Sequence, residues 1–468
     1  MNRKKLIQLG VPADCVAAAI ECIQVAAGQK ELAGRAKKVV PQIVQSPQSF
    51  VADPIWGRLA SSIIELGDVA MRIGRPIQHL TWGEGLDEQA HAQMRNACRL
   101  PISRAAALMP DAHLGYGLPI GGVLACENAV VPYGVGVDIA CRMKLTITDL
   151  SVAPIQKNDA TECRELDRAL EKGTLFGAGG NWSRPHEHEV LDADWTVTAI
   201  TREMRDKARK QLGTSGSGNH FVEWGIVSLP GELNGVPAGD YVALLSHSGS
   251  RGTGAQVCQR YTQIARQNAP AYVRDDTQLR HLAWLSMDTE AGQEYWAAMN
   301  LMGQYAHANH DVIHRNVTKL AGARSLTTIE NHHNFAWLEE HAGKKWYVHR
   351  KGATPAGEGV LGVIPGNMAD SCFIIRGKGN AGSLNSAAHG AGRCMSRTQA
   401  RREFSWGPWR DLLRQRNVRL LSGGLDEVPG AYKNIHAVMA AQQDLVDVVG
   451  KFEPKIVMMC GDDSRAED

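Results

Sequence analysis

Apolar residues recur at helical spacing through the first 80 residues of the chain. In the stretches 12–32 and 56–74 they return every three or four positions, which predicts amphipathic helices. Glycines, prolines and polar residues separate the two stretches. The pattern therefore predicts an N-terminal helical extension over residues 1–80.

From about residue 105 the pattern changes to short apolar runs bounded by glycine-rich turns. Such runs are typical of β-strands, and they occupy residues 121–132, 143–150, 240–247, 345–351 and 371–379. Helical spacing returns between them and predicts helices over residues 159–173, 201–212, 254–267, 292–320 and 434–452. Because the two kinds of element do not alternate regularly, the pattern predicts an α/β (α+β) fold without repeated βαβ units.

Composition narrows the class of protein. The chain has 468 residues, of which 44% are hydrophobic, so it can bury a sizeable core. The formal net charge of +2 excludes a uniformly basic nucleic-acid coat but allows a local basic groove. The 48 glycines exceed the usual share of about 7% and gather in motifs, which indicates many turns around a site.

The ten cysteines are scattered without a CxxC pair. The first residues lack the apolar stretch of a signal peptide, and no run of about 18 apolar residues occurs. We therefore expect a cytoplasmic protein with free thiols and no membrane partner. The last residues, 462–468, are expected to form a frayed acidic tail.

Candidate metal ligands stand in separate glycine-rich runs. Asp138 and Cys141 are three residues apart, so one turn of helix-like backbone would point both the same way. A carboxylate with a thiolate suits zinc, manganese or cobalt better than magnesium or calcium. His220 follows a glycine-rich turn, and His247 is expected at the end of a strand, where ligand sites gather in α/β folds. Each residue taken alone is equally well explained by packing.

Other histidines are weaker candidates. His332 and His333 are adjacent, and because successive side chains of an extended chain point in opposite directions, at most one is expected to be a ligand. Asp111 and His113 are expected in a turn with a supporting role. The two histidines at 186 and 188 are expected to lie in a solvated loop, and those at 307, 310 and 314 to be packing or surface residues.

Phosphate handling is indicated by basic residues beside glycine-rich turns. Arg251, Arg350 and Lys351 are the candidates for binding phosphate oxygens. The chain contains no GxxxxGK[ST] motif, so a nucleotide would be held by another scheme. His389 is flanked by small residues, and together with the ligand set it is expected to attack phosphorus through its imidazole.

Taken together, these runs closely resemble the RtcB family of RNA ligases. The matching segments follow the family's order within about residues 80–461, and they are 109–122, 135–145, 216–224, 247–254, 331–334, 350–353, 364–368, 389–400 and 431–446. The resemblance implies a catalytic domain over residues 81–461, with an RtcB-like fold and a central cleft that holds a dinuclear metal site.

The resemblance also assigns site residues. Asp138, Cys141 and His220 would hold one Mn²⁺, and Cys141, His247 and His333 the other, with Zn²⁺ or Co²⁺ as substitutes in vitro. His389 would be guanylylated by GTP. The residues that would contact the guanylate are Asn219, Phe221, Glu223, Asn334, Pro365, Gly366, Asn367, Met368, Gly390, Ala391, Gly392 and Tyr432.

By analogy the enzyme would join an RNA 2′,3′-cyclic phosphate or 3′-phosphate to a 5′-hydroxyl, in tRNA splicing or RNA repair. Its partners would be RNA with broken ends and an activating protein. Three positions depart from the family pattern: Cys460 stands in place of a lysine, and Asn367 and Cys372 in place of serines. Two alternatives therefore stay open. One is a metal-dependent RNA-end phosphoesterase with weakened guanylylation, and the other is a non-catalytic RNA-binding paralogue.

Overall fold

The computed structural model describes residues 2–28, 34–74 and 76–461, so the expected tail 462–468 lies outside the described residues. The α-helices are α1 Arg3–Gln8, α2 Val16–Ala27, α3 Ala36–Gln45, α4 Gly57–Gly74, α5 Glu88–Cys98, α6 Val152–Lys157, α7 Arg164–Gly173, α8 Ala199–Gln211, α9 Arg251–Asn268, α10 Ala271–Arg274, α11 Glu290–Leu320, α12 Arg397–Glu403, α13 Trp406–Gln415 and α14 Ile435–Ala440.

The strands belong mainly to two sheets. They are β1 Leu80–Thr81, β2 Ser103–Tyr116, β3 Leu118–Cys126, β4 Ala129–Val130, β5 Arg142–Thr148, β6 Phe221–Leu229, β7 Gly239–Ser248, β8 Leu285–Ser286, β9 Ser325–His332, β10 Asn334–His341, β11 Lys344–Lys351, β12 Ala353–Pro355, β13 Leu361–Ile364, β14 Cys372–Gly377, β15 Ser386–Ala388, β16 Arg419–Ser422 and β17 Val446–Met459. None of the helices in the described ranges is long and apolar enough to cross a membrane.

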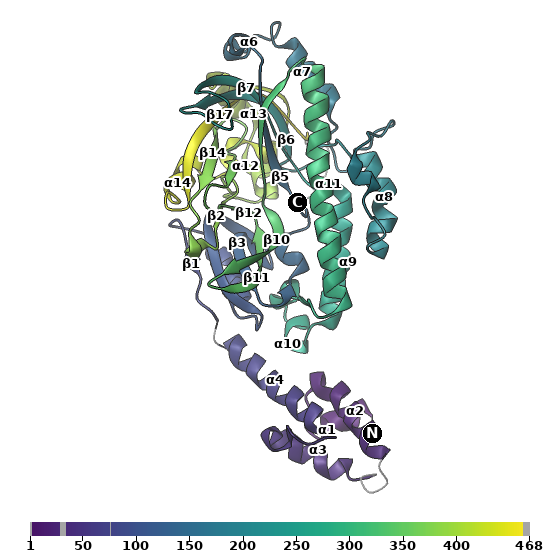
Figure 1. Cartoon of the computed structure of the whole chain (residues 1–468). Coiled ribbons are helices and arrows are strands. Elements are labelled where there is room, and N and C mark those ends of the chain that lie inside the picture. The colour runs from purple at the N-terminus through teal and green to yellow at the C-terminus, as the bar shows by residue number, and fades with distance from the viewer. Residues whose placement is uncertain (1, 29–33, 75, 462–468) are drawn as a thin grey trace.

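The N-terminal helices α1 to α4 form a group of their own at one end of the molecule (Figure 1). One face of α2 places Val16, Ala19 and Cys22 in a buried cluster with residues of the other three helices. The group meets the rest of the protein at α10, where the backbone N–H of Ala271 donates to Asp14 Oδ1 at 3.4 Å. The expected helical pattern thus ends with α4, and residues 76–79 precede β1 without regular secondary structure.

The larger sheet has the strand order β13-β14-β17-β6-β7-β5-β9, with β16 paired to β17. Along β5, Met143, Leu145 and Ile147 alternate with Lys144 and Thr146, so the two sets face opposite sides. The apolar set packs into a core cluster, while Thr146 bonds a histidine of the long helix α11. Helix α11 therefore covers one face of the sheet (Figure 1).

The smaller sheet, in the order β1-β2-β3-β11-β10, packs against the edge of the larger one. Apolar residues of β2, β3 and β11 share a buried cluster with Ile364, Phe373 and Ile375 of β13 and β14. A short pair, β12 and β15, connects this region to the segment that carries His389. The two sheets consequently bring the chain's glycine-rich runs into one central region.

The expected helix over residues 434–452 is wrong in its second half. Helix α14 ends at Ala440, and from Val446 the chain continues as β17. This strand is paired on both sides, with β14 and with β6, so its backbone donors and acceptors are satisfied by the sheet. Tertiary pairing outweighs the local helical spacing here. The run expected to form a turn at 109–117 likewise lies mostly in the irregular strand β2.

Candidate functional site: a shared-cysteine ligand cluster beside His389

Four neighbouring strands bring the candidate ligands to one end of the larger sheet. Because β6, β7, β5 and β9 are antiparallel neighbours, the starts of β5 and β6 meet the ends of β7 and β9. Cys141 precedes β5, His220 precedes β6, His247 lies near the end of β7, and His333 follows β9. Residues separated by nearly 200 positions are thereby brought into contact.

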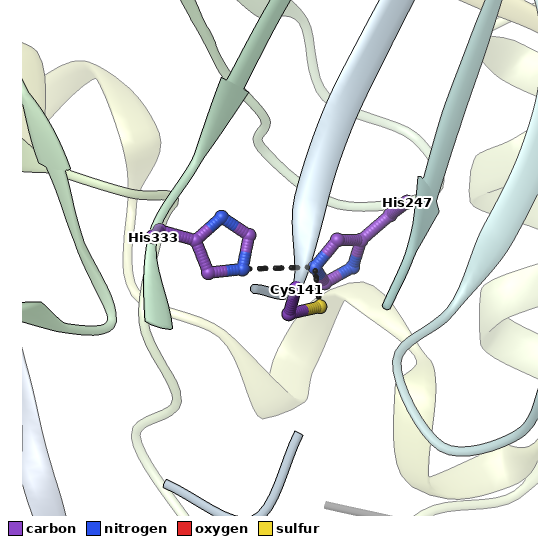
Figure 2. A group of neighbouring side chains, drawn as sticks. All are labelled: Cys141, His247 and His333. Atoms are coloured by element: carbon purple, nitrogen blue, oxygen red, sulfur yellow. Dashed lines mark hydrogen bonds between the residues drawn. The ribbon is translucent and has the colours of Figure 1, made fainter. Parts of the chain in front are cut away.

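The ligand atoms converge on the Cys141 thiol. Its Sγ lies 3.1 Å from His247 Nε2 and 3.5 Å from His220 Nε2. His247 Nε2 is 3.2 Å from His333 Nε2, and His220 Nε2 is 3.1 Å from Asp138 Oδ2. Figure 2 shows Cys141, His247 and His333 pointing toward one another. The five buried side chains form two triads that share Cys141.

Backbone carbonyls orient the two central imidazoles. His220 Nδ1 donates to the Ser215 carbonyl at 2.8 Å, and His247 Nδ1 donates to the Asn219 carbonyl at 3.2 Å. A carbonyl only accepts, so each ring carries its proton on Nδ1 and presents the Nε2 lone pair to the cluster. This arrangement is typical of histidines that bind a metal.

The Asp138 carboxylate is held by a tight turn. The Cys141 N–H donates to the Asp138 carbonyl at 3.3 Å, and the Ser250 N–H donates to Asp138 Oδ1 at 3.1 Å. A Cβ at Gly249 would come within 2.2 Å of Asp138 Oδ1, so only glycine leaves room for the carboxylate. The predicted common direction of Asp138 and Cys141 is confirmed, although the backbone forms a turn rather than a helix.

The protonation states favour metal binding. Burial, followed by the charge of His220, lowers the pKa of His247 to about 3. Burial, followed by His389, lowers the pKa of His333 well below its ordinary value. For Asp138 burial acts to raise the pKa, but its contacts with His220 and Cys141 outweigh burial and leave the pKa below normal. Unprotonated imidazoles, a carboxylate and a thiol fit a manganese- or zinc-like ion.

His389 lies next to this cluster and is oriented by Asp111. Its Nδ1 is 2.6 Å from Asp111 Oδ2, and the same oxygen accepts the backbone N–H groups of His389 at 3.1 Å and Gly390 at 3.3 Å. The His389 ring centre is 4.9 Å from that of His333. Because Asp111 holds Nδ1–H, Nε2 carries the lone pair of the imidazole. The geometry therefore prepares Nε2 as a nucleophile.

A cavity opens beside His389 and encloses about 850 Å³ of space, part of it open to solvent. Apart from Asn334, every residue expected to contact a guanylate lines it: Asn219, Phe221, Glu223, Pro365, Gly366, Asn367, Met368, Gly390, Ala391, Gly392 and Tyr432. The Asn334 amide instead donates to the Asp138 carbonyl at 3.3 Å, so this residue supports the ligand turn.

Of the three departures from the family pattern, two line this cavity and one does not. The Cys372 Sγ lies 4.0 Å from Glu223 Oε1, and burial raises the pKa of Glu223 well above its ordinary value. Asn367 Oδ1 accepts the backbone N–H groups of residues 369 and 370, so its amide caps its own turn. Cys460 is 7% exposed and lies outside the cavity lining, where Met459 contributes instead.

The three basic residues expected to bind phosphate have internal partners. Arg350 is fully buried, forms two bonds of 2.6 and 3.0 Å with Glu339, and donates to Ser386 Oγ at 2.7 Å. Its donors are used within the fold, so in this structure Arg350 has a structural role and its predicted phosphate contact gains no support. Arg251, also buried, donates to Thr214 Oγ1 at 2.9 Å and to the Gly177 carbonyl at 3.0 Å.

Lys351 Nζ donates to the Tyr116 carbonyl at 2.6 Å. Burial lowers the pKa of this amine to about 8. Neither Lys351 nor Arg251 lines the cavity beside His389. All three predicted phosphate ligands therefore stabilise the surrounding loops and strands in this structure.

The remaining histidines follow the packing interpretation with two exceptions, His186 and His188, and the latter is partly buried with its Nδ1 accepting the Val190 N–H at 3.2 Å. The ring of His332 lies 4.8 Å from Trp337, so His333 alone of this pair joins the cluster. The histidines at 310 and 314 are buried and contact Ser246. His186, expected in a solvated loop, is half-buried and its Nε2 accepts the Asn316 amide at 3.0 Å. No local pattern marked Glu427 and Arg393, which line the cavity through tertiary contacts.

Several named proteins are similar in sequence to this chain, and their names are those of the RtcB family. A family model described as tRNA-splicing ligase RtcB matches residues 93–460. The RNA-splicing ligase RtcB of Escherichia coli strain K12 is 34% identical over 397 residues, covering 80% of this chain and 95% of the relative. The tRNA-splicing ligase RtcB of Nanoarchaeum equitans is 31% identical, covering 80% and 92%, and the RNA-splicing ligase RtcB of Mycobacterium tuberculosis is 31% identical, covering 77% and 98%. With its α/β fold and this ligand cluster, the chain belongs to the RtcB family of RNA ligases.

Proposed function

We propose that this RNA ligase is GTP- and Mn²⁺-dependent and joins 2′,3′-cyclic phosphate or 3′-phosphate ends of RNA to 5′-hydroxyl ends. The observation that carries the proposal is the position of His389. Its ring adjoins two ligand triads that share Cys141, and it lines the cavity formed by the residues expected to contact a guanylate. A nucleophile, a cation site and a nucleotide cavity together are the parts that nucleotidyl transfer requires.

In the proposed reaction His389 Nε2 attacks the α-phosphorus of GTP, forming a P–N bond while pyrophosphate leaves. Asp111 keeps the proton on Nδ1 and stabilises the positive charge that develops on the imidazole. Where the RNA ends in a 2′,3′-cyclic phosphate, water first opens the ring by displacing the 2′-oxygen and leaves a 3′-phosphate. The GMP group then passes from His389 to the RNA 3′-phosphate. The 5′-hydroxyl attacks that activated phosphate and releases GMP, which completes the new phosphodiester bond.

The donor set fits the proposed pair of Mn²⁺ ions. Asp138, Cys141 and His220 would hold one ion, and Cys141, His247 and His333 the other, with the thiolate shared. When bound, such ions neutralise phosphate charge and orient the groups that exchange. The protein's own part is to keep all five ligands buried and the imidazoles of His247 and His333 unprotonated.

Covalent labelling tests the proposal directly. The purified protein incubated with Mn²⁺ and α-labelled GTP is expected to acquire a radioactive GMP group that survives denaturing electrophoresis. A γ-labelled GTP control is expected to leave no label, because its phosphate departs with pyrophosphate. A wild-type protein that remains unlabelled, while the E. coli relative is labelled in parallel, contradicts the proposal.

Replacement of Asp111 by asparagine is expected to slow guanylylation by about 10- to 100-fold, because the group that orients the nucleophile loses its charge. The measurement is the single-turnover rate of GMP labelling. Metal content, measured on the same sample, is expected to equal that of wild type, since Asp111 belongs to neither ligand triad. An unchanged labelling rate would show that Asp111 does not orient His389.

A metal-dependent phosphoesterase that opens cyclic phosphates is the second candidate. The cavity carries Cys372 and Asn367 where the family has serines, and this observation favours altered nucleotide use. Such an enzyme would open RNA cyclic phosphates without GTP, would keep this activity in a His389→Ala variant, and would lose it in a Cys141→Ala variant. Efficient joining of RNA ends by the wild type contradicts this candidate.

The cellular setting follows from the same chemistry. All ten cysteines, which lie in the described part of the chain, are free thiols. A shared thiolate ligand needs a reducing environment to stay unoxidised. We place the enzyme in the cytoplasm on this ground, with broken RNA as its substrate and an activating protein as a further partner.

A further inference from the structure

A second pocket lies next to the cavity beside His389 and encloses about 1130 Å³ of space, part of it open to solvent. We call it the arginine groove. Its walls come from α13, β16 and the loops around them, near α12 and β17 in Figure 1. Its lining residues are Asn158, Trp406, Arg410, Leu413, Arg414, Asn417, Val418, Arg419, Leu420, Leu421, Ser422 and Gly423.

The groove is strongly positive. Arg410, Arg414 and Arg419 line it, whereas its lining contains no aspartate or glutamate. Arg414 is 79% exposed and its only acidic contact at the groove is a loose one of 3.3 Å to Asp411, one turn away on the same helix. Arg410 is exposed as well. Two accessible guanidinium groups on a protein of nearly neutral charge mark this surface as an anion-binding region.

Arg419 supplies a fixed charge at the base of the groove. Its Nη2 donates to Asp167 Oδ1 at 2.6 Å, and the side chain is 22% exposed. Within the described residues its Nε and Nη1 atoms are buried and form no hydrogen bond. Because these two donors are buried and Asp167 binds Nη2, Arg419 adds positive charge to the groove but leaves phosphate contacts to Arg410 and Arg414.

Trp406 adds an aromatic surface. Its indole ring is partly exposed at the first residue of α13, and the Arg410 guanidinium lies 5.8 Å from the ring centre. A base can stack on an indole or a guanidinium whatever its sequence, while arginines hold the adjoining phosphates. An aromatic ring among arginines is therefore typical of a surface that binds single-stranded nucleic acid.

The arginine groove shares a wall with the nucleotide cavity. Leu413, Val418 and Leu420 of the groove pack in one buried cluster with Met368, Val457 and Met459, all three of which line the cavity beside His389. An ideal Cβ at Gly423 would lie 3.7 Å from Met368 Cε. One layer of side chains thus separates the arginine groove from the cavity beside His389. A single strand of a few nucleotides can reach from one to the other.

We propose that the arginine groove binds the single-stranded segment of RNA next to an end that is joined at His389. Arg410 and Arg414 contact its phosphates, and Trp406 stacks on one of its bases. The inference rests on the RNA-joining function proposed above, since it assigns a place to that substrate. It concerns binding alone and involves no bond formation.

The test compares two charge-reversal pairs in the full-length protein. The Arg410→Glu/Arg414→Glu variant changes the groove, and Arg202→Glu/Arg209→Glu makes the same change on the exposed face of α8, beyond α11 (Figure 1). Binding of a fluorescent single-stranded oligoribonucleotide with a 3′-phosphate is measured without GTP. We expect the groove variant to bind at least about tenfold more weakly than the α8 variant. We also expect the slope of log K against log salt concentration to be smaller in magnitude by about 1 to 2.

Two further measurements separate the possible failures. The groove variant is expected to retain wild-type GMP labelling, because neither arginine lines the nucleotide cavity. Trp406→Leu, which keeps the charge, is expected to weaken RNA binding about fivefold or more. Equal affinities of the groove and α8 variants overturn the inference even where labelling is normal. Loss of labelling in wild type defeats the proposed function but leaves the binding comparison intact.

The nature of the ligand is tested by competition. Inorganic phosphate at matched ionic strength is expected to displace the RNA no better than chloride does, since a strand engages both arginines and a ring at once. Selective displacement by inorganic phosphate, with no effect of Trp406→Leu, would overturn a strand-binding site in favour of a simple anion site.

Discussion

Substitution of His389 by alanine is expected to abolish covalent GMP labelling and to reduce RNA joining by at least about 10⁴-fold. The reason is chemical, because alanine has no atom that can form a P–N bond. Metal content is expected to stay at the wild-type level, since His389 belongs to neither ligand triad. Labelling with α-labelled GTP, joining of 3′-phosphate and 5′-hydroxyl RNA ends, and metal analysis are the three measurements.

A matched control for this substitution is His436→Ala. His436 is exposed on α14, packs edge-on against Phe373 and does not line the nucleotide cavity. Its replacement is expected to leave labelling and joining within about twofold of wild type, which is the usual size of a surface change. Residual labelling of His389→Ala on another residue would show that the nucleophile has been misassigned.

Replacement of Cys141 by serine is expected to impair both metal sites at once. The thiol lies within 3.5 Å of two imidazoles and belongs to both triads, so one substitution alters both proposed ion sites. A serine hydroxyl stays protonated near neutral pH and cannot bridge two cations as a thiolate does. Loss of the cations removes several kcal/mol of transition-state stabilisation, on the order of 1000-fold or more in joining rate.

The control is Cys258→Ser, a second fully buried cysteine. Its Sγ donates to the Pro132 carbonyl at 3.7 Å, a bond that a serine hydroxyl can replace. This variant is expected to keep the wild-type metal content and joining rate. Metal analysis by mass spectrometry and a joining assay at saturating Mn²⁺ distinguish the two variants. A Cys141→Ser protein with a full metal complement would refute the shared-thiolate arrangement.

The candidate site could be predicted from the sequence to a considerable depth. The spacing of Asp138 and Cys141, the position of His247 at a strand end and the choice of one ligand from the pair His332 and His333 all agree with the structure. These predictions depend on short-range geometry, which neighbouring residues largely control. The orientation of His389 by Asp111 was not foreseen, because the two residues are 278 positions apart and meet only when the sheets pack.

The errors also have a physical cause in common. Residues 446–452 have helical spacing but become part of β17, since partners on both sides offer a complete set of backbone hydrogen bonds. Arg350 is expected from the sequence to bind phosphate, yet Glu339, which lies opposite Trp346 on the neighbouring strand β10, binds its guanidinium. In each case a segment distant in the sequence forms the hydrogen bonds with these backbone or side-chain groups, in place of the partners that the local pattern predicts.

The order and chemistry of the motifs determined which reactions this protein can perform, because a thiolate, imidazoles and a carboxylate keep their ligand character wherever the chain places them. The tertiary structure decided which residues act together. It places four strand ends around Cys141 and a cavity beside His389. It also buries Arg350 against Glu339 and leaves Arg410 and Arg414 exposed along a second groove. Contacts between segments far apart in the chain arise only when the sheets close on one another, and local sequence patterns carry little information about that step.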